Sequence, residues 1–248
     1  MIGVFDSGAG GLTVLSALRT VYPSVDVVYF GDTKNAPYGS RTQAELNALT
    51  AAGLRFLTGA GATALISACN SVSASLALSL YDVLDLRSIP VIEMVGPCVA
   101  HFKERDESLA LCATEATVRS GLYQNAFRMI GKEIQTVAIP DLAGAIERGA
   151  SIDECEAQIC AALAPLQAYD TLILGCTHYP LVINAFSRVT DKTLYDPATA
   201  VAERALRDLW PREMGYGKTR FCISKESSVF RDFVARLFPE AEYTIEVV

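Results

Sequence analysis

Two cysteines, Cys69 and Cys176, stand in settings that indicate chemistry. When residues 65–71 are aligned with residues 172–178, each segment reads as an apolar run that ends in a small residue, a cysteine and two polar residues. The interval between the two segments is about the length of one small domain. This weak internal repeat predicts two similar lobes, each of which offers one thiol.

Two acid/base groups that face each other across a cleft suit a reaction in which a proton leaves one face of a carbon and another returns to the opposite face. That reaction is racemisation or epimerisation. An α-hydrogen is far less acidic than a thiol, so the site must also stabilise a developing carbanion and hold the substrate between the bases. We therefore expect polar groups around a substrate carboxylate.

Each cysteine is followed by a predicted helix start, at Asn70-Ser71 and at Thr177 to Pro180. A helix N-terminus stabilises a thiolate, which predicts a lowered pKa for both thiols. The alternative is that each cysteine is a small apolar filler, as buried cysteine often is. The matched positions favour catalysis for this pair, whereas the remaining cysteines are interpreted as structural: Cys98, Cys112, Cys155, Cys160 and Cys222.

The elements that must position these thiols alternate along the chain. Short apolar runs predict strands at 2–5, 25–30, 64–68, 91–95, 109–113, 135–139 and 171–175. Helices are predicted between them at 11–21, 43–58, 72–84, 121–130, 152–164 and 181–189. This alternation is typical of α/β proteins with mainly parallel sheets covered on both faces. Both cysteines fall at the carboxyl ends of strands, where such sheets bind ligands.

The chain is predicted to form two pseudo-symmetric α/β lobes with the active site in the cleft between them. Gly96-Pro97 is a turn signal and a candidate crossing between lobes, and a second crossing is expected near Trp210-Pro211. The first lobe would then comprise residues 1–96 with 212–248, and the second lobe residues 97–211.

Composition excludes several classes of function. A formal net charge of −7 over 248 residues argues against a nucleic-acid partner. Residues 56–81 carry no charge but contain glycines, Asn70 and several serines, so strand, polar turn and helix are favoured over a membrane span. The N-terminus lacks a basic region typical of a secretory signal, so a cytoplasmic location is expected. With seven cysteines, two histidines and no C-x2-C pair, neither a disulfide framework nor a zinc site is expected.

Further candidate ligand groups follow two other predicted strands. Asp6-Ser7 precedes the glycine-rich turn at residues 8–11, and Asp32 begins a loop that runs through Tyr38 to Ser40. Glycines in the turn allow backbone N–H groups to approach a carboxylate. Because Thr13 stands where a dinucleotide fingerprint needs its third glycine, no nucleotide cofactor is indicated.

Taken together, these motifs resemble the glutamate racemases of the aspartate/glutamate racemase superfamily. The matching stretches occur in the family's order within about residues 1–205: 3–14, 31–33 with 37–39, 68–71, 113–118 and 175–181. One departure is Val95-Gly96-Pro97-Cys98, which lacks the family's acid before proline, whereas Glu93 lies earlier.

The resemblance implies a two-lobed homodimeric enzyme, free of pyridoxal phosphate and metal, that supplies D-glutamate for peptidoglycan. It implies that Cys69 and Cys176 are the acid/base catalysts and that Asp6 and His178 assist them. The residues implied to bind substrate are Asp6, Ser7, Tyr38, Gly39, Asn70, Ser71, Thr114, Thr117, Glu147, Thr177 and His178. Two alternatives stay open: a racemase of aspartate or another acidic amino acid, and a non-catalytic regulatory protein on the same scaffold.

Overall fold

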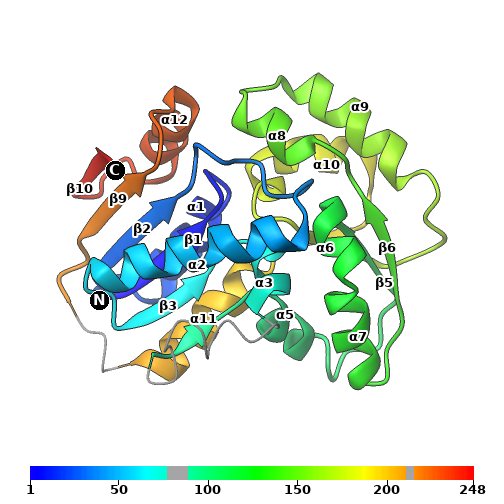
Figure 1. The fold of residues 1–248 in the computed structure, drawn as a ribbon. Helices are drawn as coiled ribbons and strands as arrows, with labels where there is room; N and C mark the ends of the chain where they lie inside the picture. The colour runs from blue at the N-terminus through cyan, green and yellow to red at the C-terminus, as the bar shows by residue number, and fades with distance from the viewer. Residues whose placement is uncertain (77–88, 211–214) are drawn as a thin grey trace.

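A computed structural model describes residues 1–76, 89–210 and 215–248, and these form two lobes (Figure 1). Each lobe is built on one sheet in which every paired strand is parallel to its neighbour. In the described chain the first sheet has the order β10-β9-β2-β1-β3-β4. Its strands are β1 (Ile2–Asp6), β2 (Val27–Gly31), β3 (Ala64–Ser67), β4 (Val91–Ile92), β9 (Thr219–Ile223) and β10 (Tyr243–Val247).

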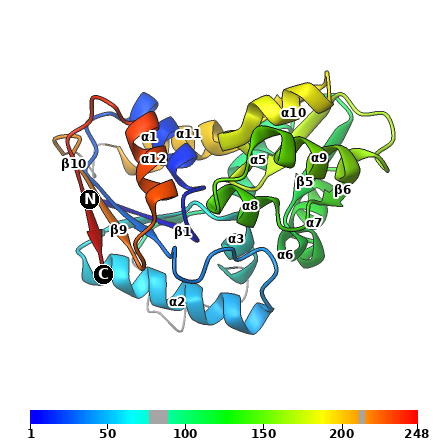
Figure 2. The same cartoon turned by 90° about the horizontal axis from the view of Figure 1, so that it is seen from above.

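Helices cover both faces of this first sheet, as Figure 2 shows from above. One face packs against α1 (Leu12–Val21), α11 (Ala198–Leu209) and α12 (Ser228–Leu237). The other face packs against α2 (Gln43–Gly59) and α3 (Asn70–Leu76). Burial on both faces explains why the strands read as continuous apolar runs.

The second sheet has the order β6-β5-β7-β8. Its strands are β5 (Leu109–Ala113), β6 (Ile134–Ala138), β7 (Thr171–Gly175) and β8 (Thr193–Tyr195). One face is covered by α8 (Leu142–Glu147), α9 (Ile152–Leu163), the 3₁₀ turn η2 (Tyr179–Val182) and α10 (Ile183–Val189). The other is covered by α5 (Val95–His101), α6 (Glu115–Ser120) and α7 (Leu122–Met129).

The strand registers bring the candidate residues to one edge of each sheet. In the first sheet Asp6 pairs with Gly31, and Phe5 pairs with Ser67. In the second sheet Ala113 pairs with both Ala138 and Gly175. The residues that follow these strands therefore emerge together at the carboxyl edges, in the position where parallel sheets bind ligands.

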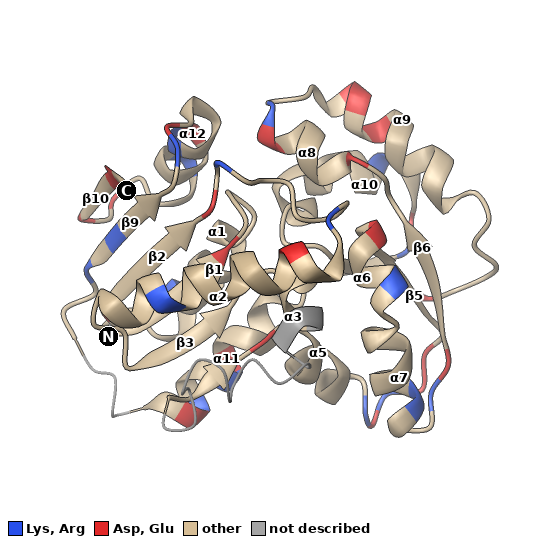
Figure 3. Ribbon diagram, in the orientation of Figure 1, with Lys and Arg blue, Asp and Glu red and all other residues tan. Residues whose placement is uncertain are grey.

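The predicted class of two α/β lobes with mainly parallel sheets is confirmed, and strands 109–113 and 171–175 are reproduced at their predicted bounds. Residues 56–76 form the end of α2, β3 and α3, as predicted; residues 77–84 of the predicted helix 72–84 lie outside the described residues. No helix of the described chain is both long enough and apolar enough to cross a membrane. Lys and Arg are interspersed with Asp and Glu over both lobes (Figure 3).

The first predicted crossing lies where the chain passes from β4 of the first sheet to α5 of the second lobe, but its conformation differs from the prediction. Gly96-Pro97 is no turn, because it lies in the first turn of α5, where proline is tolerated. The carboxylate of Glu93 caps this helix by accepting hydrogen bonds from the N–H groups of Val95 and Gly96, both at 2.6 Å.

The return to the first lobe falls before Ala198 rather than near residue 211. If the second lobe comprised residues 97–211, as predicted, it would include helix α11. Its buried side chains instead join α1 in the core of the first sheet.

Candidate active site

Cys69 and Cys176 line one cavity between the two lobes, which the sequence repeat predicted. The lining residues are Ser7, Tyr38, Gly39, Cys69, Asn70, Ser71, Thr114, Ala143, Cys176 and His178. Its volume is about 10 Å³, which is room for about one water molecule. An amino acid therefore enters only when the lobes or the lining side chains move apart. A second cavity of about 160 Å³ adjoins it and shares Gly39, Thr114 and Ala143.

The thiol of Cys69 is buried among apolar groups and beside a carboxylate. Its sulfur donates a hydrogen bond to Oγ of Ser7 at 3.8 Å. Burial, reinforced by the negative charge of Asp6, raises the pKa of Cys69 to about 12, and the backbone N–H of Val72 only partly opposes this. The expectation of a lowered pKa at a helix start is wrong for Cys69, because desolvation outweighs the helix N-terminus.

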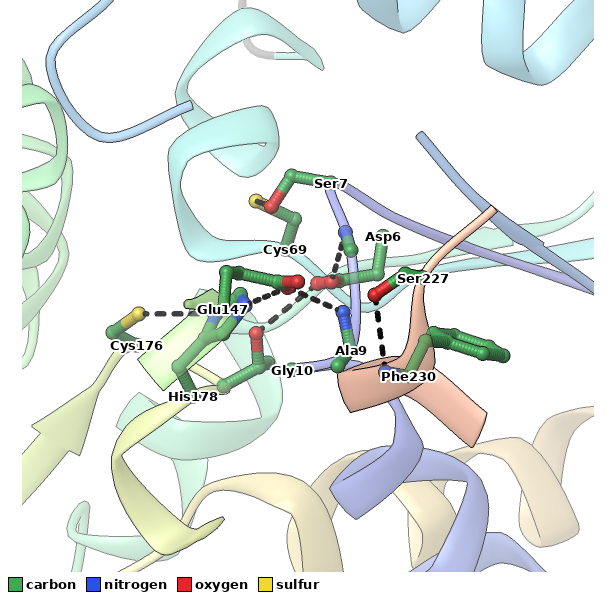
Figure 4. Close-up of polar contacts among 12 residues, drawn as sticks. Asp6, Ser7, Ala9, Gly10, Cys69, Glu147, Cys176, His178, Ser227 and Phe230 are labelled. Carbon is green, nitrogen blue, oxygen red and sulfur yellow. Dashed lines mark hydrogen bonds and ion pairs between the residues drawn. The ribbon is translucent and has the colours of Figure 1, made fainter. Parts of the chain in front are cut away.

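Cys176 has a different neighbourhood, drawn in Figure 4. Its sulfur lies 3.8 Å from Nδ1 of His178. Nε2 of His178 lies 2.6 Å from Oε1 of Glu147, and the same carboxylate oxygen accepts a 2.6 Å hydrogen bond from the N–H of Ala9. The chain of contacts thus runs from a catalytic candidate in the second lobe to the glycine-rich turn of the first lobe.

The imidazole of His178 and the carboxylate of Glu147 form a buried ion pair. Burial alone would lower the pKa of His178, but its hydrogen bonds with Cys176 and Glu147 outweigh burial and raise that pKa well above its ordinary value. Burial alone would raise the pKa of Glu147, but the hydrogen bond and charge of His178 outweigh it and lower that pKa. His178 therefore places a positive charge beside the sulfur of Cys176.

Glycines are required where the turn at residues 8–11 meets this ion pair. A Cβ on Gly8 would lie 2.0 Å from Oε1 of Glu147, and a Cβ on Gly10 would lie 2.5 Å from Nδ1 of His178. We expected the N–H groups of this turn to approach a carboxylate, and they do. The carboxylates belong to the protein itself, since the N–H of Gly8 donates to Asp6 and that of Ala9 to Glu147.

Asp6 lies behind the cavity rather than in its wall. It is fully buried, and its Oδ2 accepts a 3.1 Å hydrogen bond from the hydroxyl of Thr177. Burial raises the pKa of Asp6, although the charge of His178 and the N–H of Gly8 partly offset the effect. Asp6 and Thr177, both implied to bind substrate, therefore join the two lobes beneath the cavity.

Three hydroxyl groups form a cluster on the opposite side of the site. Oγ of Ser71 lies 3.0 Å from Oγ1 of Thr114, which lies 3.0 Å from Oγ1 of Thr117. Thr114 also caps α6 by accepting a hydrogen bond from the N–H of Thr117. Ser71 and Thr114 line the cavity, whereas Thr117 supports them from behind.

Tyr38 lines the cavity, while its hydroxyl is hydrogen-bonded to a protein carboxylate. It donates a 2.6 Å hydrogen bond to Oδ2 of Asp32, and burial together with that bond raises the pKa of Tyr38. Asp32 also accepts hydrogen bonds from the side chains of Asn35 and Ser224. Asp32 therefore holds the side chain of Tyr38 in place. The position of Asp32 after β2 marked it as a candidate site residue, but the sequence did not predict this supporting role.

Sequence reasoning missed Ala143 as a lining residue, and it gave no role to Ser224. Ala143 lies inside α8 and carries no polar group, so nothing in its local sequence distinguishes it. Ser224 reaches Asp32 only because β9 lies beside β2 in the sheet.

The sequence and the fold of this chain are both similar to those of known amino-acid racemases. The family model described as Asp/Glu/Hydantoin racemase matches residues 13–205. The glutamate racemase of Mycobacterium ulcerans is 38% identical over 221 residues, which are 86% of this chain and 80% of the relative. The crystal structure of the Francisella tularensis glutamate racemase, solved with D-glutamate, has a TM-score of 0.88 at 27% identity and covers 100% of this chain and 96% of that one.

The aspartate racemase of Picrophilus torridus shares the fold, with a TM-score of 0.59 at 17% identity over 83% of this chain and 92% of that one. The family model spans most of the chain, and it includes both strand ends that carry the thiols of the shared cavity. By its sequence, its fold and the extent of both matches, the chain belongs to the Asp/Glu/hydantoin racemase family.

Proposed function

We propose that this protein is a glutamate racemase that needs no cofactor and uses Cys69 and Cys176 as its two acid/base groups. The observation that carries the proposal is that both thiols line one cavity while their neighbours differ in charge. Cys69 lies beside a carboxylate and Cys176 beside an imidazolium. The choice of glutamate is supported by the names of the relatives and by the D-glutamate bound to the Francisella tularensis neighbour.

This asymmetry supports different roles for the two groups in one direction of the reaction. The raised pKa of Cys69 keeps that residue protonated, and the sulfur of Cys176 lies 3.8 Å from the imidazole of His178. In one direction Cys176 takes the α-proton, so a C–H bond breaks and an S–H bond forms. The electron pair stays on the α-carbon and its carboxylate until Cys69 returns its own proton to the opposite face.

The same two groups serve the reverse reaction with their roles exchanged. After one turnover Cys176 carries the proton and Cys69 is the thiolate, which is the form that accepts the other enantiomer. The negative charge that develops on the substrate needs hydrogen-bond donors, and the hydroxyls of Ser71 and Thr114 are available in the cavity wall.

The cellular role in this proposal is the supply of D-glutamate for peptidoglycan in the cytoplasm, by a homodimer. Sedimentation of the purified protein tests the homodimer directly, and a monomer under assay conditions would reject that part of the proposal.

The activity is tested by incubating the protein with L- and D-glutamate in the presence of a chelator and without pyridoxal phosphate. We expect both enantiomers to interconvert, and we expect Cys69→Ser and Cys176→Ser each to lower the rate by about a thousandfold or more. Cys160→Ser is the matched control, because Cys160 is exposed and lies in a helix of the second lobe. Turnover of aspartate in place of glutamate would reassign the substrate, and a folded wild type without turnover of either would reject the proposal.

A further inference from the structure

The side-chain amide of Asn70 has one satisfied end and one unsatisfied end. Its Oδ1 accepts a 2.6 Å hydrogen bond from the hydroxyl of Tyr123. Its Nδ2 is buried and has no hydrogen-bond partner among the described residues. A buried N–H group without a partner is costly, so such a donor in the wall of a binding cavity indicates an acceptor on the ligand.

Tyr123 reaches this amide from the other lobe. It lies on α7 and is fully buried in the core of the second lobe beside Phe102 and Phe127, whereas Asn70 begins α3 in the first lobe. The hydroxyl of Tyr123 also lies near the buried thiol of Cys98. Burial raises the pKa of both Tyr123 and Cys98, so both groups keep their protons.

The direction of the contact with Asn70 is set by the hydroxyl of Tyr123, which keeps its proton and donates it to Oδ1 of Asn70. The only acceptor in a side-chain amide is its oxygen, so Oδ1 faces Tyr123 and Nδ2 faces the cavity. Without the hydroxyl, the amide is free to turn its oxygen toward an anionic ligand.

We propose that Tyr123 is a positioning residue, whose hydroxyl holds the Asn70 amide with Nδ2 toward the cavity so that it binds a carboxylate of the substrate. This inference rests on the proposed function, which supplies the carboxylate. It adds a residue of the second lobe to the recognition of substrate by the first lobe. The contact also makes this donor depend on the observed arrangement of the two lobes.

Tyr123→Phe removes the hydroxyl and keeps the ring in the core. We expect the KM for both enantiomers of glutamate to rise about tenfold, as for the loss of one hydrogen bond to a charged group, while kcat changes much less. Tyr195→Phe is the matched control. Tyr195 packs in the same core as Tyr123, and its buried hydroxyl has no hydrogen-bond partner among the described residues, so KM is expected to stay unchanged.

A double-mutant cycle separates positioning from a general loss of structure. Asn70→Ala alone is expected to raise KM, and Tyr123→Phe added to Asn70→Ala is expected to raise it no further, because the hydroxyl acts only through the amide. Equal effects of Tyr123→Phe in both backgrounds would overturn the inference, as would an unchanged KM in the single variant. A folded wild type without turnover would reject the proposed function, and the inference would fall with it.

A measurement on the wild type covers the case in which Tyr123→Phe does not fold. The side-chain NH₂ signals of Asn70 in a ¹⁵N-correlated NMR spectrum are identified by their loss in Asn70→Asp. We expect D-glutamate to shift them. Signals that stay in place while the protein is saturated with D-glutamate would overturn the inference.

Discussion

The ion pair between Glu147 and His178 is the contact whose loss has the clearest consequences. Glu147→Gln removes the negative charge but keeps an oxygen that accepts the hydrogen bond from the N–H of Ala9. The side chains of His178 and Glu147 are 2% and 10% exposed, so solvent screens their interaction little. Removing one partner of a buried ion pair costs about 3 to 5 kcal/mol, and the retained bond to Ala9 favours the lower figure of about 3 kcal/mol.

The pH dependence of this loss follows from the two pKa shifts. The pKa of Glu147 is lowered from 4.5, so its contribution to stability is present above that value and is lost as pH falls through the folded-state pKa. The pKa of His178 is raised from 6.5, so its contribution is present below that value and is lost as pH rises through the folded-state pKa. The difference in unfolding free energy between wild type and Glu147→Gln is therefore largest between these two reference values.

Denaturant unfolding at several pH values measures the difference directly. The chain has two histidines, so the Hε1 proton of His178 is resolved by NMR against that of His101 alone. We expect the pKa of His178 to fall in Glu147→Gln. Asp141→Asn is the control, because the ion pair of Asp141 with Arg148 is exposed and contributes at most about 1 kcal/mol. A loss no larger than that of the control, or a wild-type His178 that titrates below its ordinary pKa, would refute the reasoning.

Two further predictions concern other buried groups. Burial raises the pKa of Asp196 from 3.8 to about 6, so its ionisation opposes folding as pH rises through that interval. Asp196→Asn keeps the oxygen that caps the N–H of Ala198 and is expected to add about 3 kcal/mol of stability at pH 8 but none below the ordinary carboxyl pKa, as chemical denaturation will show. Gly8→Ala forces a Cβ against Glu147 and is expected to cost about 1 to 3 kcal/mol together with most of the activity, whereas Gly59→Ala, which meets nothing within 4 Å, should cost neither. A Gly8→Ala protein as stable and active as Gly59→Ala would contradict the close packing of the turn.

Much of the fold was predictable because local pattern and burial coincide. Strands such as β5 and β7 are apolar runs buried on both faces, and polar residues follow each of them. Their bounds can therefore be predicted from the sequence. The conformation at the first crossing and the position of the second crossing were not predictable, because both depend on tertiary contacts. Proline is compatible both with a loop turn and with the first turn of a helix. At Pro97 the helix forms, and the carboxylate of Glu93 stabilises its first turn by accepting hydrogen bonds from backbone N–H groups.

In the candidate site, too, the features set by local sequence were predictable and those set by tertiary contacts were not. The repeat predicted that Cys69 and Cys176 share a cavity, because strand ends in parallel sheets converge. The pKa of Cys69 was mispredicted, since desolvation depends on atoms from distant segments, including Asp6. The pairing of Glu147 with His178 likewise joins residues from separate elements, and no spacing rule relates them.

Deuterium incorporation during the first turnovers in D₂O tests the two-thiol account most directly. One thiolate removes the substrate's proton while the other thiol, already exchanged with solvent, delivers deuterium to the opposite face. The account predicts that early product carries deuterium at the α-carbon while unreacted substrate keeps its proton, whichever enantiomer is supplied. Deuterium that enters recovered substrate as fast as product would show a single base serving both faces, and it would contradict the roles of Cys69 and Cys176.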